Sequence, residues 1–441
     1  MSITQIPFTL KFLIVIIITF SISLVLTPIM TFVSKAIGAV DNPNARRVNK
    51  KPMPTAGGVP IFIAFVFTTL VLLPVIVHSQ PLVGSSGGKT GVLHLQSYLN
   101  YILPFVIGGA IIVITGLIDD IKELSPKMKL LGQIIAASFV WFFTHARFDN
   151  LKIPFGGPML TFPAWLSFIF SVFWIVAITN AINLIDGLDG LCSGVSVISL
   201  LTMGLVSYFF LPSPNIFLPI TIFTLVAAIL GFFPYNYHPA IIFLGDTGAL
   251  FLGFMISVIS LQGLKNATAV AVVTPLLILG VPLTDTIMAM IRRKLNRQKI
   301  TSADKRHLHH RLLALGFTHR GAVLVIYGIA GIFAFISIIL QVSNRIGGIL
   351  LLVACLFGLE IFIELVGILG ENRQPMLKFL RFIGNSGYRD AVIHHGNYDE
   401  KTDSDNDEED TIEIERPLIT NDNLDNVESK QHLSRVEKDK K

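Results

Sequence analysis

Residues 163–211 read PAWLSFIFSVFWIVAITNAINLIDGLDGLCSGVSVISLLTMGLVSYFFL, two apolar stretches joined by a short polar turn. Each apolar stretch is close to the roughly 20 residues that an α-helix needs to cross a bilayer. The turn carries Asp186 and Asp189, each followed by glycine. This stretch therefore predicts two membrane-spanning helices with acidic side chains at one membrane surface.

The composition of the whole chain agrees with this reading. Of its 441 residues, 52% are hydrophobic and 14% are charged, and the mean hydropathy is +0.68. Soluble domains carry about 25% charged residues, and a backbone in lipid must satisfy its own hydrogen bonds. We therefore predict an all-α, polytopic helical membrane protein with about eleven transmembrane helices. The expected spans are approximately 8–33, 58–78, 101–118, 128–144, 163–184, 191–211, 214–233, 241–262, 268–291, 320–341 and 346–370.

Basic residues are distributed unevenly among the loops between these spans. Clusters fall at 35–51, 122–129 and 292–311, whereas the intervening loops hold only isolated basic residues: Lys89, Arg147, Lys152, Lys265 and Arg345. The positive-inside rule places the loops with clusters in the cytoplasm. We therefore expect a multi-pass protein of the plasma membrane, with its amino terminus outside and its carboxyl terminus cytoplasmic.

Acidic residues gather beside the same loops: Asp41, Asp119, Asp120, Asp186, Asp189, Asp246 and Asp304. The opposite loops contain Asp149 and little else. Ionisable groups at the ends of membrane helices are costly unless they are paired, hydrated or bound to metal. This one-sided distribution predicts a functional site on the cytoplasmic face.

Three of the acidic motifs suggest a cation site, and two of them have a simpler alternative. Asp119 and Asp120 are adjacent, so a divalent cation would relieve their repulsion; pairing with Lys122 or Lys129 would do so as well. Asp186 and Asp189 are three residues apart, a spacing that places both on one face of a helix, although a plain tight turn has a similar composition. Asp246 begins an apolar span between glycines, and Mg²⁺ typically takes one or two carboxylates together with phosphate oxygens.

The longest and most basic loop contains His307-Leu308-His309-His310-Arg311. Clustered histidines can bind Zn²⁺, but the surrounding lysines and arginines favour phosphate binding. For the cluster 292–294 a patch for anionic lipid is the preferred interpretation. Asp285 lies inside a span and is a functional candidate by default, although hydrogen bonding between helices explains it equally well.

Taken together, these motifs resemble the polyprenyl-phosphate N-acetylhexosamine-1-phosphate transferase family over about residues 40–320. The matching pieces are 54–58, 116–120, 183–190, Asn236 with 243–248, and 307–311. The histidine motif differs from the three consecutive histidines followed by glutamate of muramoyl-pentapeptide transferases. It is similar to that of the N-acetylglucosamine-1-phosphate branch, which initiates wall teichoic acid and O-antigen synthesis.

The resemblance implies roles for particular residues. Asp246 corresponds to the principal Mg²⁺ ligand, and Asp120 is expected to add to the metal field. The implied catalytic residues are Asp119, Asp120, Asp246 and His309. The implied substrate-binding residues are Lys51, Gly57, Gly58, Asn183, Asp186, Gly187, Asp189, Asn236, Phe243, His307, His310 and Arg311.

The resemblance also implies an activity. The expected reaction transfers N-acetylglucosamine-1-phosphate from UDP-N-acetylglucosamine to undecaprenyl phosphate and releases UMP. The implied cofactor is Mg²⁺, with Mn²⁺ as a substitute; the partners are the two substrates and membrane lipids, with no nucleic acid, and a homodimer is left open. The alternatives are a muramoyl-pentapeptide phosphotransferase, a membrane transporter or channel, and a scaffold that recruits partners through an acidic tail.

The sequence predicts two regions. Residues 1–371 are expected to form the transmembrane catalytic domain, and 372–441 a cytoplasmic tail. After about residue 399 the chain is rich in Asp, Glu, Asn and Lys, a composition that cannot bury enough apolar area to fold alone. We expect this part of the tail to be disordered and solvated.

Overall fold

A computed structural model describes residues 8–43, 51–75, 95–144, 146–152, 159–210, 216–263, 276–277, 279–295, 307–367 and 374–384. The elements in the first part of the chain are α1 (Phe8–Ile37), β1 (Val40–Asp41), β2 (Met53–Pro54), α2 (Gly58–Phe67), the π-helix η2 (Thr68–Leu72), α4 (Leu95–Lys122), α5 (Pro126–Phe143), β3 (Asn150–Lys152) and β4 (Met159–Thr161). They are followed by α6 (Ala164–Leu184), α7 (Leu191–Phe209), α8 (Phe217–Asn236), α9 (Gly245–Gly263), α11 (Gly280–Leu295), α12 (Leu308–Ala314), α13 (His319–Val342), α14 (Arg345–Val366) and α15 (Pro375–Gly384).

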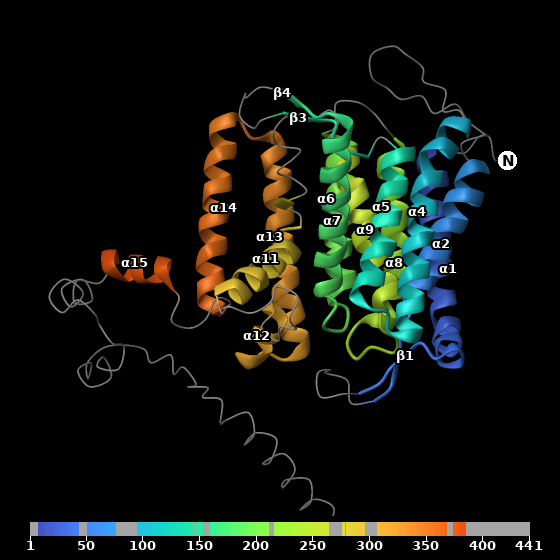
Figure 1. Ribbon diagram of the computed structural model, residues 1–441, viewed down its shortest axis with the longest axis horizontal. Coiled ribbons are helices and arrows are strands. Elements are labelled where there is room, and N and C mark those ends of the chain that lie inside the picture. Colours follow the sequence, from blue (N-terminus) through green and yellow to red (C-terminus); the bar gives the residue numbers. More distant parts are fainter. Residues whose placement is uncertain are drawn as a thin grey trace, which may run out of the picture. The chain divides into compact units, whose positions relative to one another are not determined.

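The described residues form a bundle of long apolar helices, as the composition predicts (Figure 1). Among them, nine helices are long and apolar enough to cross a membrane: α1, α2 with its continuation to Val75, α4, α6, α7, α8, α9, α13 and α14. The chain is therefore a multi-pass membrane protein. The expected span at 268–291 corresponds in part to α11, which begins at Gly280, and residues 264–275 lie outside the described part.

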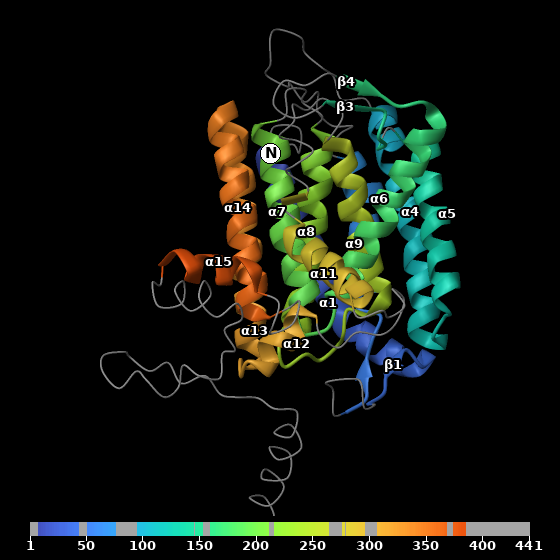
Figure 2. The same ribbon diagram turned by 60° about the vertical axis from the view of Figure 1, so that its left-hand side comes forward.

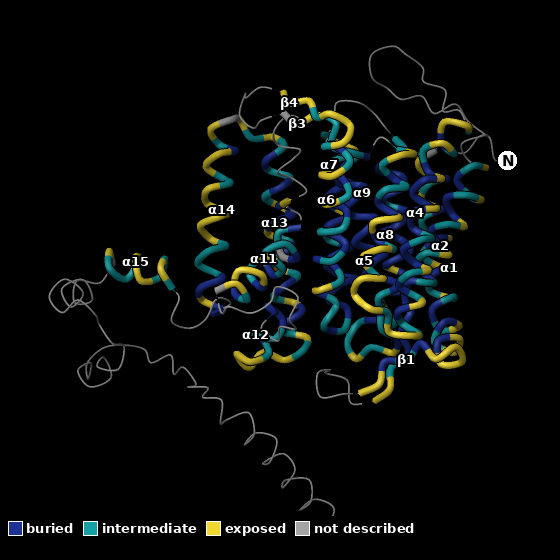
Figure 3. Tube along the Cα trace, in the orientation of Figure 1, coloured by how far each residue is buried: buried dark blue, intermediate teal, exposed yellow. Residues whose placement is uncertain are grey.

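Burial separates the centre of the bundle from its edge (Figure 3). In the most apolar stretch of α9, 83% of the residues are buried, compared with 17% in α14. The apolar side chains that α14 and α1 leave exposed are suited to contact with lipid. Helix α9 therefore forms the core, and the residues at its first turn are held by its neighbours α2, α4 and α6.

Glycines allow these helices to approach closely at one end of α9. A Cβ atom added to Gly58 of α2 would lie 2.3 Å from the Cα of Gly248, and one added to Gly116 of α4 would lie 2.5 Å from the Cα of Thr247. Small residues at such crossings let membrane helices pack backbone to backbone. The start of α9 is thereby fixed against two helices from the amino-terminal part of the chain.

The segment before α2 is tied to the same end of the bundle. Strand β1 pairs antiparallel with β2, and the backbone N–H of Phe243 donates to the carbonyl of Pro54 at 2.9 Å. Both views of the molecule place β1 and α12 at one end of the helices, with β3 and β4 at the other (Figures 1 and 2).

One local prediction was wrong. Asp186 and Asp189 do not share a helix face, because α6 ends at Leu184 and α7 begins at Leu191. Gly190 adopts a left-handed conformation with φ of +77°, which residues other than glycine rarely adopt. The two carboxylates lie instead in the tight turn that connects these helices.

The chain divides into two compact units, 1–376 and 377–441. In the second unit the structure describes only the rest of α15, up to Gly384. The predicted acidic tail after residue 399 and Asp304 lie outside the described residues, so the division into a catalytic domain and a disordered tail stays a prediction.

Candidate active site

A pocket of about 620 Å³ lies at the end of the bundle that carries β1 and α12. Most of the acidic motifs meet there, although they are far apart in the sequence. The predicted site residues that line it are Lys51, Asp186, Gly187, Asp189, Asn236, Phe243, Asp246, His309 and His310. A volume of this size is typical of sites for small molecules and cofactors.

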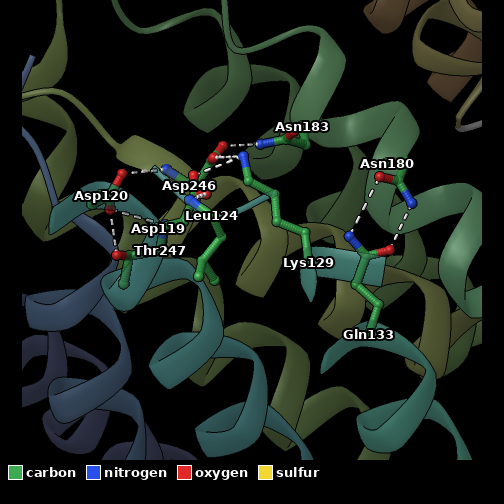
Figure 4. A network of polar contacts seen from close by, with 9 residues as sticks. All are labelled: Asp119, Asp120, Leu124, Lys129, Gln133, Asn180, Asn183, Asp246 and Thr247. Atoms are coloured by element: carbon green, nitrogen blue, oxygen red, sulfur yellow. Dashed lines mark hydrogen bonds and ion pairs between the residues drawn. The ribbon is translucent and has the colours of Figure 1, made fainter. Parts of the chain in front are cut away.

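Asp246, in the first turn of α9, is the centre of a polar network (Figure 4). Its Oδ1 accepts a hydrogen bond from Asn183 Nδ2 at 2.6 Å, and its Oδ2 forms an ion pair with the Lys129 ammonium. The same ammonium lies 2.7 Å from Asp119 Oδ2. Two carboxylates from different helices therefore converge on one positive charge.

Asp120 has a different environment from its neighbour Asp119. Its Oδ1 accepts from the backbone N–H of Asp246 at 2.9 Å, and its Oδ2 accepts from the backbone N–H and the hydroxyl of Thr247. These are free N–H groups at the start of α9, which an acidic side chain satisfies well. In this structure Asp120 holds the first turn of α9, while Asp119 faces Asp246 through Lys129.

The turn between α6 and α7 supplies two further acids. Burial, together with the charges of Asp246, Asp120 and Asp189, raises the pKa of Asp186 to about 8. Asp186 therefore holds a proton to higher pH than an ordinary aspartate does. Asp189 Oδ2 lies 2.7 Å from His238 Nδ1.

Asp189, His238 and His319 form a compact group whose potential ligand atoms all lie within 4.8 Å of one another. The backbone N–H of Asp189 donates to His319 Nε2 at 3.0 Å, and the two imidazole rings stack with centroids 4.1 Å apart. Because His238 Nδ1 is paired with Asp189 Oδ2 and His319 Nε2 accepts from the Asp189 backbone, we assign the group to shaping the pocket wall rather than to holding a metal.

The histidine motif divides into two parts. His309 and His310 line the pocket, whereas His307 is buried and its Nδ1 lies 3.1 Å from Asp285 Oδ2. Burial, followed by the charge of His310, lowers the pKa of His309 to about 3. His309 is therefore a neutral imidazole at physiological pH, able to donate or accept a hydrogen bond but not to act as a cation.

Several predicted substrate-binding residues have structural contacts instead of lining the pocket. Arg311 Nε donates to the carbonyl of Val366 at 3.2 Å. The backbone N–H groups of Gly57 and Gly58 donate to the carbonyls of Phe243 and Leu244. These residues fix the histidine motif and the segment before α2 in place.

Asn236 lies both at the pocket wall and in the core. It accepts from the hydroxyl of Ser193 at 2.7 Å and donates to the carbonyl of Ile242 at 3.1 Å. Its amide therefore shapes the loop that carries Phe243.

Four ionisable residues of the pocket or the network were not predicted as site residues: Asp41, Lys129, His238 and His319. Asp41 belonged to the one-sided set of acids, and Lys129 was a candidate partner for the Asp119–Asp120 pair. No pattern in the sequence pointed to His238, which follows α8, or to His319, which begins α13; both become site residues through their contacts with Asp189.

Comparison with known proteins agrees with this geometry. Residues 102–264 match the sequence model of the family described as glycosyl transferase family 4. A Bacillus subtilis (strain 168) protein named probable undecaprenyl-phosphate N-acetylglucosaminyl 1-phosphate transferase is 38% identical over 360 residues, which cover 81% of this chain and 93% of that protein. The chain belongs to glycosyl transferase family 4.

Two further relatives of this family 4 glycosyl transferase are more distant. The decaprenyl-phosphate N-acetylglucosaminephosphotransferase of Mycolicibacterium smegmatis is 34% identical, with 68% of this chain and 74% of that protein covered. The undecaprenyl-phosphate alpha-N-acetylglucosaminyl 1-phosphate transferase of Escherichia coli O157:H7 is 26% identical, with 71% and 79% covered. The resemblance inferred from the motifs is thereby confirmed.

Proposed function

We propose that this family 4 glycosyl transferase moves N-acetylglucosamine-1-phosphate from UDP-N-acetylglucosamine to undecaprenyl phosphate and releases UMP. The observation that carries the proposal is the convergence of Asp246, Asp119 and Lys129 beside a pocket at one end of the membrane helices. The names of the relatives support the choice of the two substrates.

The position of the pocket suits a reaction between a lipid and a water-soluble donor. The acceptor phosphate lies at the headgroup level of a leaflet, whereas the nucleotide sugar comes from the cytosol. The basic clusters at 35–51, 122–129 and 292–311 favour a cytoplasmic location for this end of the bundle. On this assignment the amino terminus lies outside, in the plasma membrane of the cell.

The donor set around Asp246 fits a hard divalent cation. The carboxylates of Asp119 and Asp246, from two helices, converge at one point that the Lys129 ammonium already occupies with its positive charge, and Asn183 Nδ2 donates to Asp246 from a third helix (Figure 4). Mg²⁺ prefers such oxygen ligands together with phosphate oxygens and water. We assign Asp246 and Asp119 as its protein ligands, and we assign Asp120 to positioning the first turn of α9.

The chemistry leaves little covalent work for the protein. Phosphoryl transfer depends mainly on aligning two anions and neutralising charge, and a bound Mg²⁺ would supply part of that neutralisation at the diphosphate. A phosphate monoester has its second pKa near 6, so the acceptor is already largely dianionic at neutral pH. We therefore assign no obligatory general base.

The remaining pocket residues would bind and orient the donor. Lys51 adds a positive charge at the pocket wall, and the Phe243 ring offers a flat apolar surface. His309 is neutral, so it would orient a donor oxygen through a hydrogen bond. Lys129 would move away from Asp246 when the cation binds and would then be free to contact a phosphate oxygen.

A donor panel tests the proposal. The full-length protein in nanodiscs is supplied with Mg²⁺, undecaprenyl phosphate and one of three donors: UDP-N-acetylglucosamine, UDP-N-acetylgalactosamine or UDP-N-acetylmuramoyl-pentapeptide. We expect UMP release with UDP-N-acetylglucosamine that requires the acceptor and is lost with EDTA. Release only with the muramoyl-pentapeptide donor would favour the alternative transferase, and no release with any donor would reject the proposal.

A further inference from the structure

The last described helix, α15 (Pro375–Gly384), is strongly amphipathic. Its sequence is PMLKFLRFIG, and on a helix with 3.6 residues per turn Met376, Phe379 and Ile383 share one face. Phe379 and Ile383 are 56% and 59% exposed. Lys378 and Arg381 lie on the opposite side, so a broad apolar face is set against a narrow basic one.

The start of α15 is bound to the end of a membrane-spanning helix. The backbone N–H of Met376 donates to Glu364 Oε1 at 2.8 Å, and Gln374 Nε2 donates to the Glu364 carbonyl at 3.3 Å. Glu364 is itself buried in the last turn of α14. These bonds place Gln374 and Met376, at the start of α15, beside the last turn of α14.

This is also the end of the bundle that carries the active-site pocket. Arg311, which follows His310 in α12, donates to the carbonyl of Val366 at the end of α14. The end of α14 therefore contacts both the histidine motif and the first residues of α15.

A helix of this length is marginal in water by itself, and its exposed apolar face needs a non-aqueous surface. An interfacial helix combines a large apolar face, basic residues on the polar face and proximity to the membrane, and α15 has all three. We propose that α15 lies in the headgroup region of the leaflet on the active-site side. Its apolar face meets the acyl chains, and Lys378 and Arg381 contact anionic phospholipid headgroups.

The alternative occupants of the apolar face are a second copy of the chain and another part of the same chain. A lipid surface is favoured because basic residues flank the apolar face, and anionic lipid attracts basic residues close to the membrane. It is also favoured because the Met376–Glu364 bond starts α15 at the end of a membrane-spanning helix, next to the bilayer.

The test compares two positions on opposite faces of α15. Ile383→Cys and Lys378→Cys are each labelled with an environment-sensitive fluorophore in the full-length protein; Cys192 and Cys355 are buried in the membrane helices, and unmodified protein gives the labelling background. Nanodiscs contain phosphatidylglycerol and phosphatidylcholine, with or without nitroxide-labelled acyl chains. We expect the Ile383→Cys label to be quenched several-fold more by nitroxide lipid, and several-fold less by aqueous iodide, than the Lys378→Cys label.

Equal iodide quenching of the two labels would overturn the proposal, as would the absence of nitroxide quenching at Ile383→Cys. Iodide protection of Ile383→Cys without nitroxide quenching would show that protein, and not lipid, covers the apolar face. The proposal also requires the Ile383→Cys label to be less protected from iodide in nanodiscs of phosphatidylcholine alone. The double variant Lys378→Gln with Arg381→Gln should remove that dependence on anionic lipid, and a difference that persists would exclude the assigned headgroup contacts. None of these readouts depends on turnover, so the outcome is independent of the proposed reaction.

Discussion

Asp285 binds His307, 22 residues further along the chain, and so joins the histidine motif to helix α11. The carboxylate lies in α11, and its Oδ2 is 3.1 Å from His307 Nδ1. Its Oδ1 accepts from the backbone N–H of Leu308 at 2.9 Å, which is one of the free N–H groups at the start of α12. This one side chain fixes both the ring of His307 and the first turn of the helix that presents His309 and His310.

We expect Asp285→Ala to lower kcat by about 10- to 100-fold, as the loss of an orienting partner does at other sites. The reason is that His307 and the Leu308 N–H both lose their acceptor. Asp149→Ala is the matched control, because Asp149 forms an ion pair with Arg147 on the opposite face. Steady-state UMP release from both variants measures the effect, and equal rates would show that Asp285 is not a positioning residue.

Gly187 leaves room for the imidazole of His309. A Cβ atom at this position would lie 2.4 Å from His309 Nε2, so Gly187→Ala should displace the ring. A displacement of about 1 Å in a site residue can reduce the rate on the order of 100-fold. Gly328→Ala, in α13, meets no atom within 4 Å and should retain wild-type turnover. A fully active Gly187→Ala protein would mean that His309 does not need its observed position.

Lys129 neutralises Asp119 and Asp246 when no cation is bound. In Lys129→Ala the two carboxylates repel each other, so we expect the melting temperature without Mg²⁺ to fall. Mg²⁺ should then raise the melting temperature more than it does in the wild-type protein, since binding to the folded state adds stability. Lys127→Ala changes a nearby residue of the same helix and should behave like the wild type. If Mg²⁺ raised the melting temperature by the same amount in both variants, Lys129 would not belong to the cation site.

His309 should make stability depend on pH in the acid range. Its folded-state pKa is about 3, against 6.5 for an ordinary histidine, so between these values the unfolded chain binds more protons than the folded one. The contribution is fully present above pH 6.5 and is lost as pH falls toward 3, by at most about 1.4 kcal/mol per pH unit. Melting temperatures between pH 7 and pH 5 should fall more steeply in the wild type than in His309→Asn, and parallel curves would contradict the assignment.

Much of the fold could be predicted because each membrane helix corresponds to a long apolar stretch of sequence. The first predicted span, 8–33, corresponds to α1, although the helix continues to Ile37, since Ser34 and Lys35 at its end are compatible with helix. The wrong helical assignment of Asp186 and Asp189 came from spacing alone. Spacing could not show that Gly190 would adopt a left-handed conformation and form a turn.

The sequence predicted which residues belong to the candidate site better than it predicted the contacts among them. The acids were found because charge is costly at membrane helix ends and so is confined to one side. The sequence could not tell that Asp120 points to the backbone of α9 and Asp119 to Lys129, because adjacent residues on a helix diverge by about 100°. The contact between Asp285 and His307 depends on how α11 packs beside α12, and local sequence patterns do not predict that packing.

The central claim is that Asp246 binds the cation that the transfer requires. The most direct test is UMP release by Asp246→Asn as Mg²⁺ is titrated, with UDP-N-acetylglucosamine and undecaprenyl phosphate in excess and protein folding checked by melting temperature. Asparagine keeps the size of the side chain and removes its charge, so we predict a loss of about 100- to 1000-fold. A folded Asp246→Asn protein with near-normal turnover and unchanged Mg²⁺ dependence would contradict the account.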